Sequence, residues 1–131
     1  LLYECIYNTS EYMFSTLKPG VPLLDVDKII RKYTFEQLKE AGVCKNFEDI
    51  GTYMWHGGAH HVGFDVHDVV EGSGLAVPGV VFCVDLGGCR VIWEIGFRLE
   101  DNCLITEDGC ENLSRAIPRQ IDEIEAFMGR R

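Results

Sequence analysis

Basic residues are scarce in this sequence. Lys and Arg total 12 against 21 Asp and Glu, which gives a formal net charge of −9. No Lys/Arg cluster precedes Arg130 and Arg131, so a nucleic acid or an anionic membrane surface is not an expected partner. The chain also lacks any apolar run near the roughly 20 residues that cross a membrane. No charged-then-apolar leader opens it, and we therefore expect a cytoplasmic protein.

Cysteine pairs with metal-binding spacing are absent as well. The six cysteines include no C-x-x-C pair, which argues against a structural zinc module and against a thioredoxin-like motif. An even count is compatible with disulfides in a secreted protein. Because no leader is seen, we interpret the cysteines as free and mostly buried thiols in a reducing compartment.

The length of 131 residues is that of one domain, and the first part of the chain predicts two helices. Residues 2–17 carry apolar side chains at helical spacing, and Lys18-Pro19-Gly20 ends that helix. Asp25 is a candidate N-cap of a second helix, whose apolar stripe precedes a C-terminal cap at Gly42.

From Val43 onward the pattern changes to short apolar runs with frequent glycine. The predicted strands are 80–84, 90–93, 97–100 and 102–106. Gly87-Gly88 indicates a turn or bulge between the first two, and 107–109 a tight turn after the last. Pro118 begins a final helix. The order of helix, helix, strands and helix predicts an α+β domain.

All four histidines lie between His56 and His67. Histidine is the commonest neutral metal ligand and the usual proton carrier near pH 7, so we expect any chemistry to occur here. His56 and His60 have the i, i+4 spacing of the zinc-protease motif H-E-x-x-H. That motif is rejected, because Gly57-Gly58 disfavours a helix and the Glu is missing.

An extended segment fits the histidines better. In a strand, His61 and His67 would share one face and His60 would lie on the other. A bend or bulge must therefore occur if His60 and His67 serve one site. The alternative is a polar turn with surface histidines.

Two acids near strand ends favour a site. Asp85 ends one apolar run, and Glu100 follows an apolar residue in another. An unpaired buried charge is costly, and a divalent metal bound by both acids and His60 would supply a partner. For each acid the alternative is a salt bridge, with Arg90 or Arg98.

Residues 56–68, HGGAHHVGFDVHD, closely resemble the histidine motif of the proline-specific metallopeptidases. These are aminopeptidase P and prolidase, in the superfamily of creatinase and methionine aminopeptidase. Residues 121–128 are also typical of aminopeptidase P, and three further segments agree in order and spacing. They are 77–85, like a strand ending in a metal-binding Glu, 96–101, like a second glutamate strand, and 104–113, like the strand and turn that follow.

The resemblance covers the whole chain and implies the later part of a pita-bread α+β fold. In that fold a curved antiparallel sheet flanked by helices surrounds two metal ions, commonly manganese, with zinc or cobalt as other possibilities. By position, His60, Asp85 and Glu100 are the implied metal ligands, and Glu100 is the bridging one.

The resemblance also implies the catalytic set His56, His67, Arg98 and Asp85. His56 and His67 occupy positions that contact substrate, and Arg98 a supporting position. Two cations can share a hydroxide that attacks the Xaa-Pro bond. A ligand carboxylate can move the proton, and a neutral His67 can donate a hydrogen bond to the developing oxyanion.

Two departures from the family pattern matter. The family's pair of aspartate ligands lies on a hairpin upstream of the first helix, and neither Asp25 nor Asp27 substitutes for it. We therefore expect 1–131 to be a partial catalytic domain, without that hairpin and the N-terminal domain. The usual Glu-Pro-Gly is here Asp85-Leu86-Gly87, followed by Gly88. Asp is one methylene shorter than Glu, and a misplacement of about 1 Å can cost about a hundredfold in rate.

The first functional hypothesis is a hydrolase, a metal-dependent Xaa-Pro aminopeptidase or dipeptidase acting on proline-containing peptides. This chain would be its fragment, with an incomplete metal site and no activity alone. The alternative is a non-catalytic pita-bread module that binds peptides or proteins, which Asp85 favours and the intact histidines oppose. An incomplete sheet leaves an open edge and an apolar face, which predicts self-association or a homo-oligomer.

Overall fold

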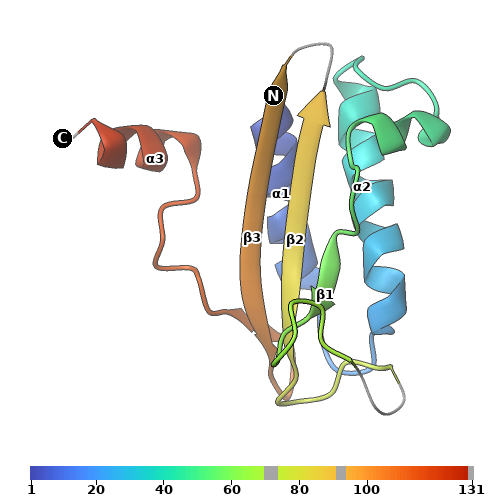
Figure 1. Cartoon of the computed structure of the whole chain (residues 1–131), viewed down its shortest axis with the longest axis vertical. Helices are drawn as coiled ribbons and strands as arrows, with labels where there is room; N and C mark the ends of the chain where they lie inside the picture. Colours follow the sequence, from blue (N-terminus) through green and yellow to red (C-terminus); the bar gives the residue numbers. More distant parts are fainter. Residues whose placement is uncertain (70–73, 91–93, 130–131) are drawn as a thin grey trace.

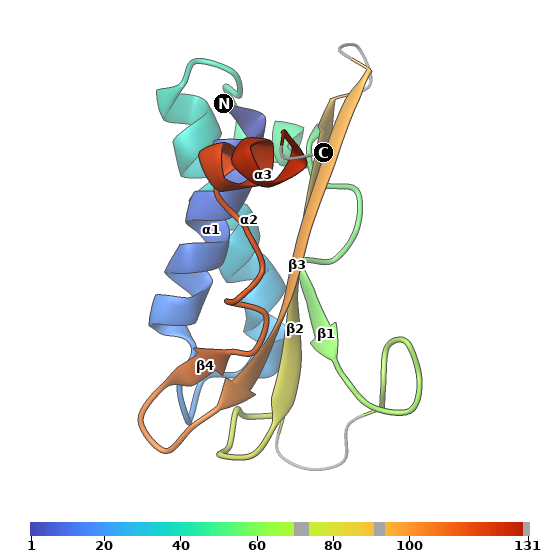
Figure 2. The same cartoon turned by 90° about the vertical axis from the view of Figure 1, so that its left-hand side faces the viewer.

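The structure is a computed structural model that describes residues 1–69, 74–90 and 94–129. It has two layers, a four-stranded antiparallel sheet and a layer of helices (Figure 1). Seen along the sheet edge, α1 and α2 cover the same face, and the loop after β1 projects on the other side (Figure 2). The elements are α1 (Leu2–Thr16), α2 (Val26–Glu40), β1 (Ala59–His61), β2 (Val81–Arg90), β3 (Ile95–Ile105), β4 (Cys110–Asn112) and α3 (Ile121–Met128), with short 3-10 helices at Leu23–Asp25 and Phe47–Thr52.

The two long helices form where their apolar periodicity predicts them. α1 ends at Thr16, directly before the predicted stop. Asp25 occupies the N-cap position of α2, but its carboxylate accepts a hydrogen bond from Lys28 at 2.8 Å instead of capping the helix. After the helix, Gly42 has φ +71°, a left-handed conformation that suits glycine and lets the chain turn away.

The strands pair in the order β1-β2-β3-β4, all antiparallel. The predicted turn at Gly87-Gly88 is wrong, because β2 runs through both residues and pairs with β3 along its length. A Cβ at Gly88 would lie 2.5 Å from Ile6 Cδ1, so this glycine permits close approach of α1. β3 likewise joins two predicted strands into one. Of the predicted strand 90–93, residues 91–93 lie outside the described residues.

The segment after β3 follows the sequence in part. The predicted turn at 107–109 is confirmed, with Thr106 N donating to Gly109 O at 3.0 Å between β3 and β4. The final helix begins at Ile121, so the predicted start at Pro118 is wrong. The reason is Arg119, whose side chain turns inward to Asp101 and Glu11 while Gln120 stays extended as the N-cap.

The core lies between the helices and one face of the sheet. Met13, Ile30, Val84 and Ile105 are at most 1% exposed. The predicted α+β class is confirmed by this layered arrangement. The cysteines whose side chains are described are free thiols, as predicted: Cys5, Cys44, Cys83, Cys103 and Cys110. Within the described ranges, no helix is long and apolar enough to cross a membrane.

Candidate metal centre

Helix α2 fixes the chain that leads into β1. Arg31 donates hydrogen bonds to the carbonyl oxygens of Met54, at 3.1 Å, and His56, at 2.8 Å. Asp27 forms an ion pair with Arg31 at 2.8 Å and accepts a hydrogen bond from Gly58 N at 2.8 Å. The i, i+4 pair on the helix surface therefore holds the glycine-rich segment that carries the first histidine.

The segment after β1 bends back on itself. β1 ends at His61, and Asp68 then accepts a hydrogen bond from Phe64 N at 3.0 Å. A Cβ at Gly63 would collide with the Asp68 carboxylate, so the tight loop requires glycine there. The bend returns His67 to His60, with ring centroids 4.7 Å apart. The predicted bend is thus present, and it brings the two histidines together.

Strand register brings ligand-type side chains from three strands onto the sheet face opposite α1. His60 of β1 lies opposite Cys83 of β2, and Asp85 lies opposite Glu100 of β3. Directly opposed residues of antiparallel strands share a face, and so do residues two apart on one strand. His60 Nε2 lies 3.7 Å from Glu100 Oε1.

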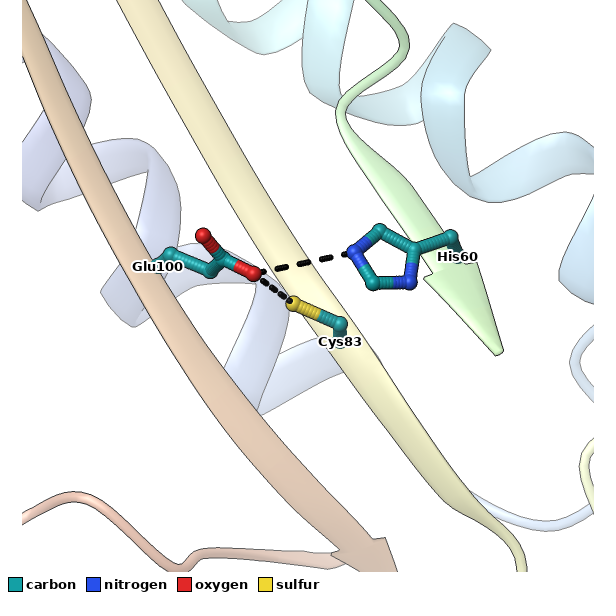
Figure 3. A group of neighbouring side chains, drawn as sticks. All are labelled: His60, Cys83 and Glu100. Carbon is teal, nitrogen blue, oxygen red and sulfur yellow. Dashed lines mark hydrogen bonds and ion pairs between the residues drawn. The ribbon is translucent and has the colours of Figure 1, made fainter. Parts of the chain in front are cut away.

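Cys83 forms the floor of this group. Its thiol is fully buried and donates a hydrogen bond to Glu100 Oε1 at 3.3 Å. Burial and the neighbouring Glu100 carboxylate raise the pKa of the Cys83 thiol above its usual range. The ligand atoms of His60, Cys83 and Glu100 all lie within 4.8 Å of one another. Figure 3 shows the imidazole and the thiol directed at the same carboxylate oxygen.

Asp85 faces a different set of neighbours. Its Oδ2 lies 3.7 Å from His56 Nδ1, and its Oδ1 lies 3.5 Å from Arg98 Nε. Although Asp85 is only 6% exposed, no donor among the described residues makes a hydrogen bond to Oδ1. Gly87 leaves room for the His56 ring, since a Cβ there would collide with His56 Nε2. One buried carboxylate oxygen is therefore left without a hydrogen-bond donor.

The structure gathers the predicted site residues into two adjoining groups. His67, His60 and Glu100 form one, while His56, Asp85 and Arg98 form the other. Arg98 connects them, because its Nη1 also lies 3.9 Å from Glu100 Oε2. The salt bridge between Asp85 and Arg98, the alternative drawn from the sequence, is present as well.

Sequence reasoning missed three residues of this region. They are Cys83, Asp27 and Arg31. Cys83 stands two positions before Asp85 on the same strand, so strand alternation could have put both on one face. The signal for the other pair was its i, i+4 spacing near the start of α2.

The donor set fits a divalent cation. Imidazole, thiolate and carboxylate are the groups that bind zinc and related transition metals. The buried Asp85 oxygen without a hydrogen bond is a place where a positive charge would be stabilising. An open sheet face with these ligands and additional histidines is the kind of site found in metal-dependent hydrolases.

The comparison of sequences agrees with this class. The sequence model of metallopeptidase family M24 matches residues 1–107, and the chain belongs to that family. The chain is 32% identical to Xaa-Pro aminopeptidase 2 of Streptomyces coelicolor, and the match covers 98% of this chain and 32% of the relative. It is 30% identical to the Xaa-Pro aminopeptidase of Escherichia coli K12, over 97% of this chain and 33% of that protein.

Solved structures show the same similarity. A candidate aminopeptidase P from Bacillus anthracis superposes with a TM-score of 0.90 at 32% identity, over 98% of this chain and 31% of that one. Zinc-substituted E. coli aminopeptidase P in complex with product gives 0.83 at 28% identity, over 98% and 34%. The expected pita-bread similarity is confirmed. The chain spans about a third of the length of the curated relatives it matches.

Proposed function

We propose that the gene product containing this chain hydrolyses the Xaa-Pro bond of proline-containing peptides in a metal-dependent reaction. Membership of family M24 and similarity to Xaa-Pro aminopeptidases and dipeptidases support this proposal. The observation that carries it is the grouping of His60 with His67 and Glu100, 4.7 and 3.7 Å away, on the sheet face opposite α1.

His60 and Glu100 would hold a divalent cation, with Asp85 beside them. Such a cation supplies Lewis-acid polarisation of the scissile carbonyl and activates water near neutral pH. Manganese, zinc and cobalt are all compatible with imidazole and carboxylate ligands. Zinc occupies the E. coli relative in one solved structure. Two manganese ions remain our expectation for the complete site.

The remaining residues would orient the substrate. A neutral His67 ring beside His60 can donate a hydrogen bond to the carbonyl oxygen, which gains charge as the bond is attacked. His56 and Arg98 hold Asp85 in place from two sides. The positive charge of Arg98 also balances the carboxylates of Asp85 and Glu100, which face each other across β2 and β3.

The test is release of the N-terminal residue from an Xaa-Pro peptide, with an Xaa-Ala peptide as control. It is measured for the complete gene product and for the printed chain alone. We expect manganese-dependent turnover of the Xaa-Pro peptide by the gene product. His67→Ala should lower kcat by about 10²–10³-fold, the usual cost of losing one oxyanion donor, with metal content unchanged.

A matched control is His61→Phe. His61 packs edge-on against Phe82 with centroids 4.9 Å apart, and phenylalanine keeps that contact. We expect its turnover to match the parent protein. Equal activity of the His67→Ala variant and the parent would contradict the assigned role of His67, and no turnover with any divalent metal would contradict the peptidase proposal.

The second candidate is a peptide- or protein-binding module without catalysis. The contacts of Asp85 favour it, since this carboxylate faces His56 and Arg98 in place of His60 and Glu100. Calorimetric binding of an intact Xaa-Pro peptide to the metal-loaded gene product, without cleavage, would support this candidate.

A further inference from the structure

Cys83 lies at the centre of the candidate metal centre and has no part in the function proposed above. It is 0% exposed on the middle strand β2, directly opposite His60 of β1. On its other side Glu100 of β3 approaches diagonally and accepts the thiol hydrogen bond at 3.3 Å. Three strands thus bring a nitrogen, a sulfur and an oxygen ligand atom within 4.8 Å of one another (Figure 3).

Asp85 leaves this place open. Its shorter side chain lies against His56 and Arg98, and its atoms do not belong to the group formed by His60 and Glu100. The side chain that does reach the pair, from the same face of β2, is the Cys83 thiol. The buried Asp85 Oδ1, which receives no hydrogen bond from the described residues, adds uncompensated negative charge on the same face.

We propose that Cys83 is a metal ligand in this protein, so that His60, Cys83 and Glu100 form a mixed nitrogen, sulfur and oxygen site that favours zinc over manganese. The inference rests on the proposed function, because it requires a divalent cation between His60 and Glu100. Soft thiolate ligands select zinc, whereas carboxylate and water ligands suit manganese.

Binding replaces one bond by another. The S–H bond of Cys83 breaks, its proton leaves to solvent, and the sulfur lone pair forms the bond to the cation. Without metal, the same proton is shared with Glu100 through the hydrogen bond between them. The cation takes the place of this proton, so the arrangement needs no large movement of the strands.

The other interpretation of Cys83 is a buried thiol that fills space beneath Glu100. Cys103 provides a matched case, because it is also 0% exposed and lies on the neighbouring strand, opposite Phe82 on the helix-covered face. Loss of either thiol removes a buried sulfur, but only Cys83 has His60 and Glu100 beside it.

The experiment loads the printed chain and the complete gene product with cobalt and records the near-ultraviolet spectrum. We expect a sulfur-to-cobalt charge-transfer band in the parent protein and in the Cys103→Ala variant, and its loss in Cys83→Ser. Zinc affinity measured by calorimetry should fall about tenfold or more in Cys83→Ser, with little change for manganese. X-ray absorption of the zinc-loaded parent protein should show a sulfur neighbour at about 2.3 Å, a readout that needs no variant.

The outcomes separate this inference from the proposed function. Cobalt binding that is abolished by His60→Ala, but shows no charge-transfer band and no sulfur neighbour, would overturn the role of Cys83 and leave the metal site intact. Failure of every divalent cation to bind the gene product would overturn both proposals.

Discussion

Asp85 and Asp101 are buried aspartates on neighbouring strands that face opposite sides of the same sheet. Asp85 is 6% exposed and Asp101 is 3% exposed. Asp101 is paired by the protein itself, with Arg119 Nη2 at 2.8 Å and Nε at 3.0 Å from its Oδ2. Asp85 keeps one oxygen without a hydrogen bond from the described residues. The difference separates a carboxylate that holds the fold together from one that awaits a group supplied from outside.

The surroundings of the two acids differ in the same way. Arg119 is mostly buried and also contacts Glu11, Ser10 and the rings of Tyr7 and Phe14, so it fastens the segment before α3 to α1. The cation beside Asp85 is Arg98, whose side chain is 57% exposed and therefore weakly bound. The helix-covered face is satisfied by its own residues, whereas the opposite face is not.

The largest expected effect comes from removing the partner of Asp101. Arg119→Ala would leave a buried carboxylate without its cation, and we expect the free energy of unfolding to fall by about 3–5 kcal/mol. Urea denaturation followed by circular dichroism measures this change. Arg115→Ala, an exposed arginine of the same segment, is the control and should change stability by less than about 0.5 kcal/mol. Equal behaviour of the two variants would mean that Asp101 is not held by Arg119.

A smaller effect is expected from the adjacent glycines of β2, which face opposite sides. Gly88→Ala would press a methyl group into the buried side chain of Ile6, at an expected cost of about 1–3 kcal/mol, with the metal site unchanged. Gly87→Ala would collide with His56, which is partly exposed and can swing toward solvent. We expect Gly87→Ala to cost less than about 1 kcal/mol and to move the His56 ring signals in a nuclear magnetic resonance spectrum.

The two glycine variants check each other. If Gly87→Ala proved the more destabilising, His56 would be locked in the fold and not free to meet a substrate. If Gly88→Ala left stability unchanged, the close approach of α1 would not depend on this glycine.

These glycines also show how far the sequence could predict the fold. The apolar periods of α1 and α2 were sufficient, because each helix buries one regular stripe. Gly87-Gly88 was interpreted as a turn, since glycine has the same composition signal in a turn and in a strand that is approached closely on both faces. Only the packing of Ile6 and His56 distinguishes the two cases.

The site was predictable to the level of residue type but not of grouping. Its histidines and acids stood out, whereas the position of Cys83 depends on register across three strands. The pairs His60 with Cys83 and Asp85 with Glu100 are set by hydrogen bonding between segments far apart in the chain. A shift by one residue would turn every one of these side chains to the other face.

The smallest effect, with the opposite sign, is expected for Asp85→Asn. Neutralising a buried carboxylate with one oxygen lacking a hydrogen bond removes a desolvation cost, and the ion pairs lost with His56 and Arg98 are partly exposed and weak. We expect the metal-free chain to gain about 0.5–2 kcal/mol in urea denaturation, as changes at strained functional sites commonly do. The matched variant Asp101→Asn should instead lose stability, because it breaks the buried pair with Arg119.

The same two variants respond differently to metal if Asp85 serves a bound cation. Zinc stabilises any protein that binds it only when folded, in proportion to its affinity. The rise in melting temperature on adding zinc should therefore shrink in Asp85→Asn and persist in Asp101→Asn, despite the lower stability of the latter. A loss of stability in Asp85→Asn as large as in Asp101→Asn, with the zinc response intact in both, would show that Asp85 is a structural residue like its counterpart on the other face.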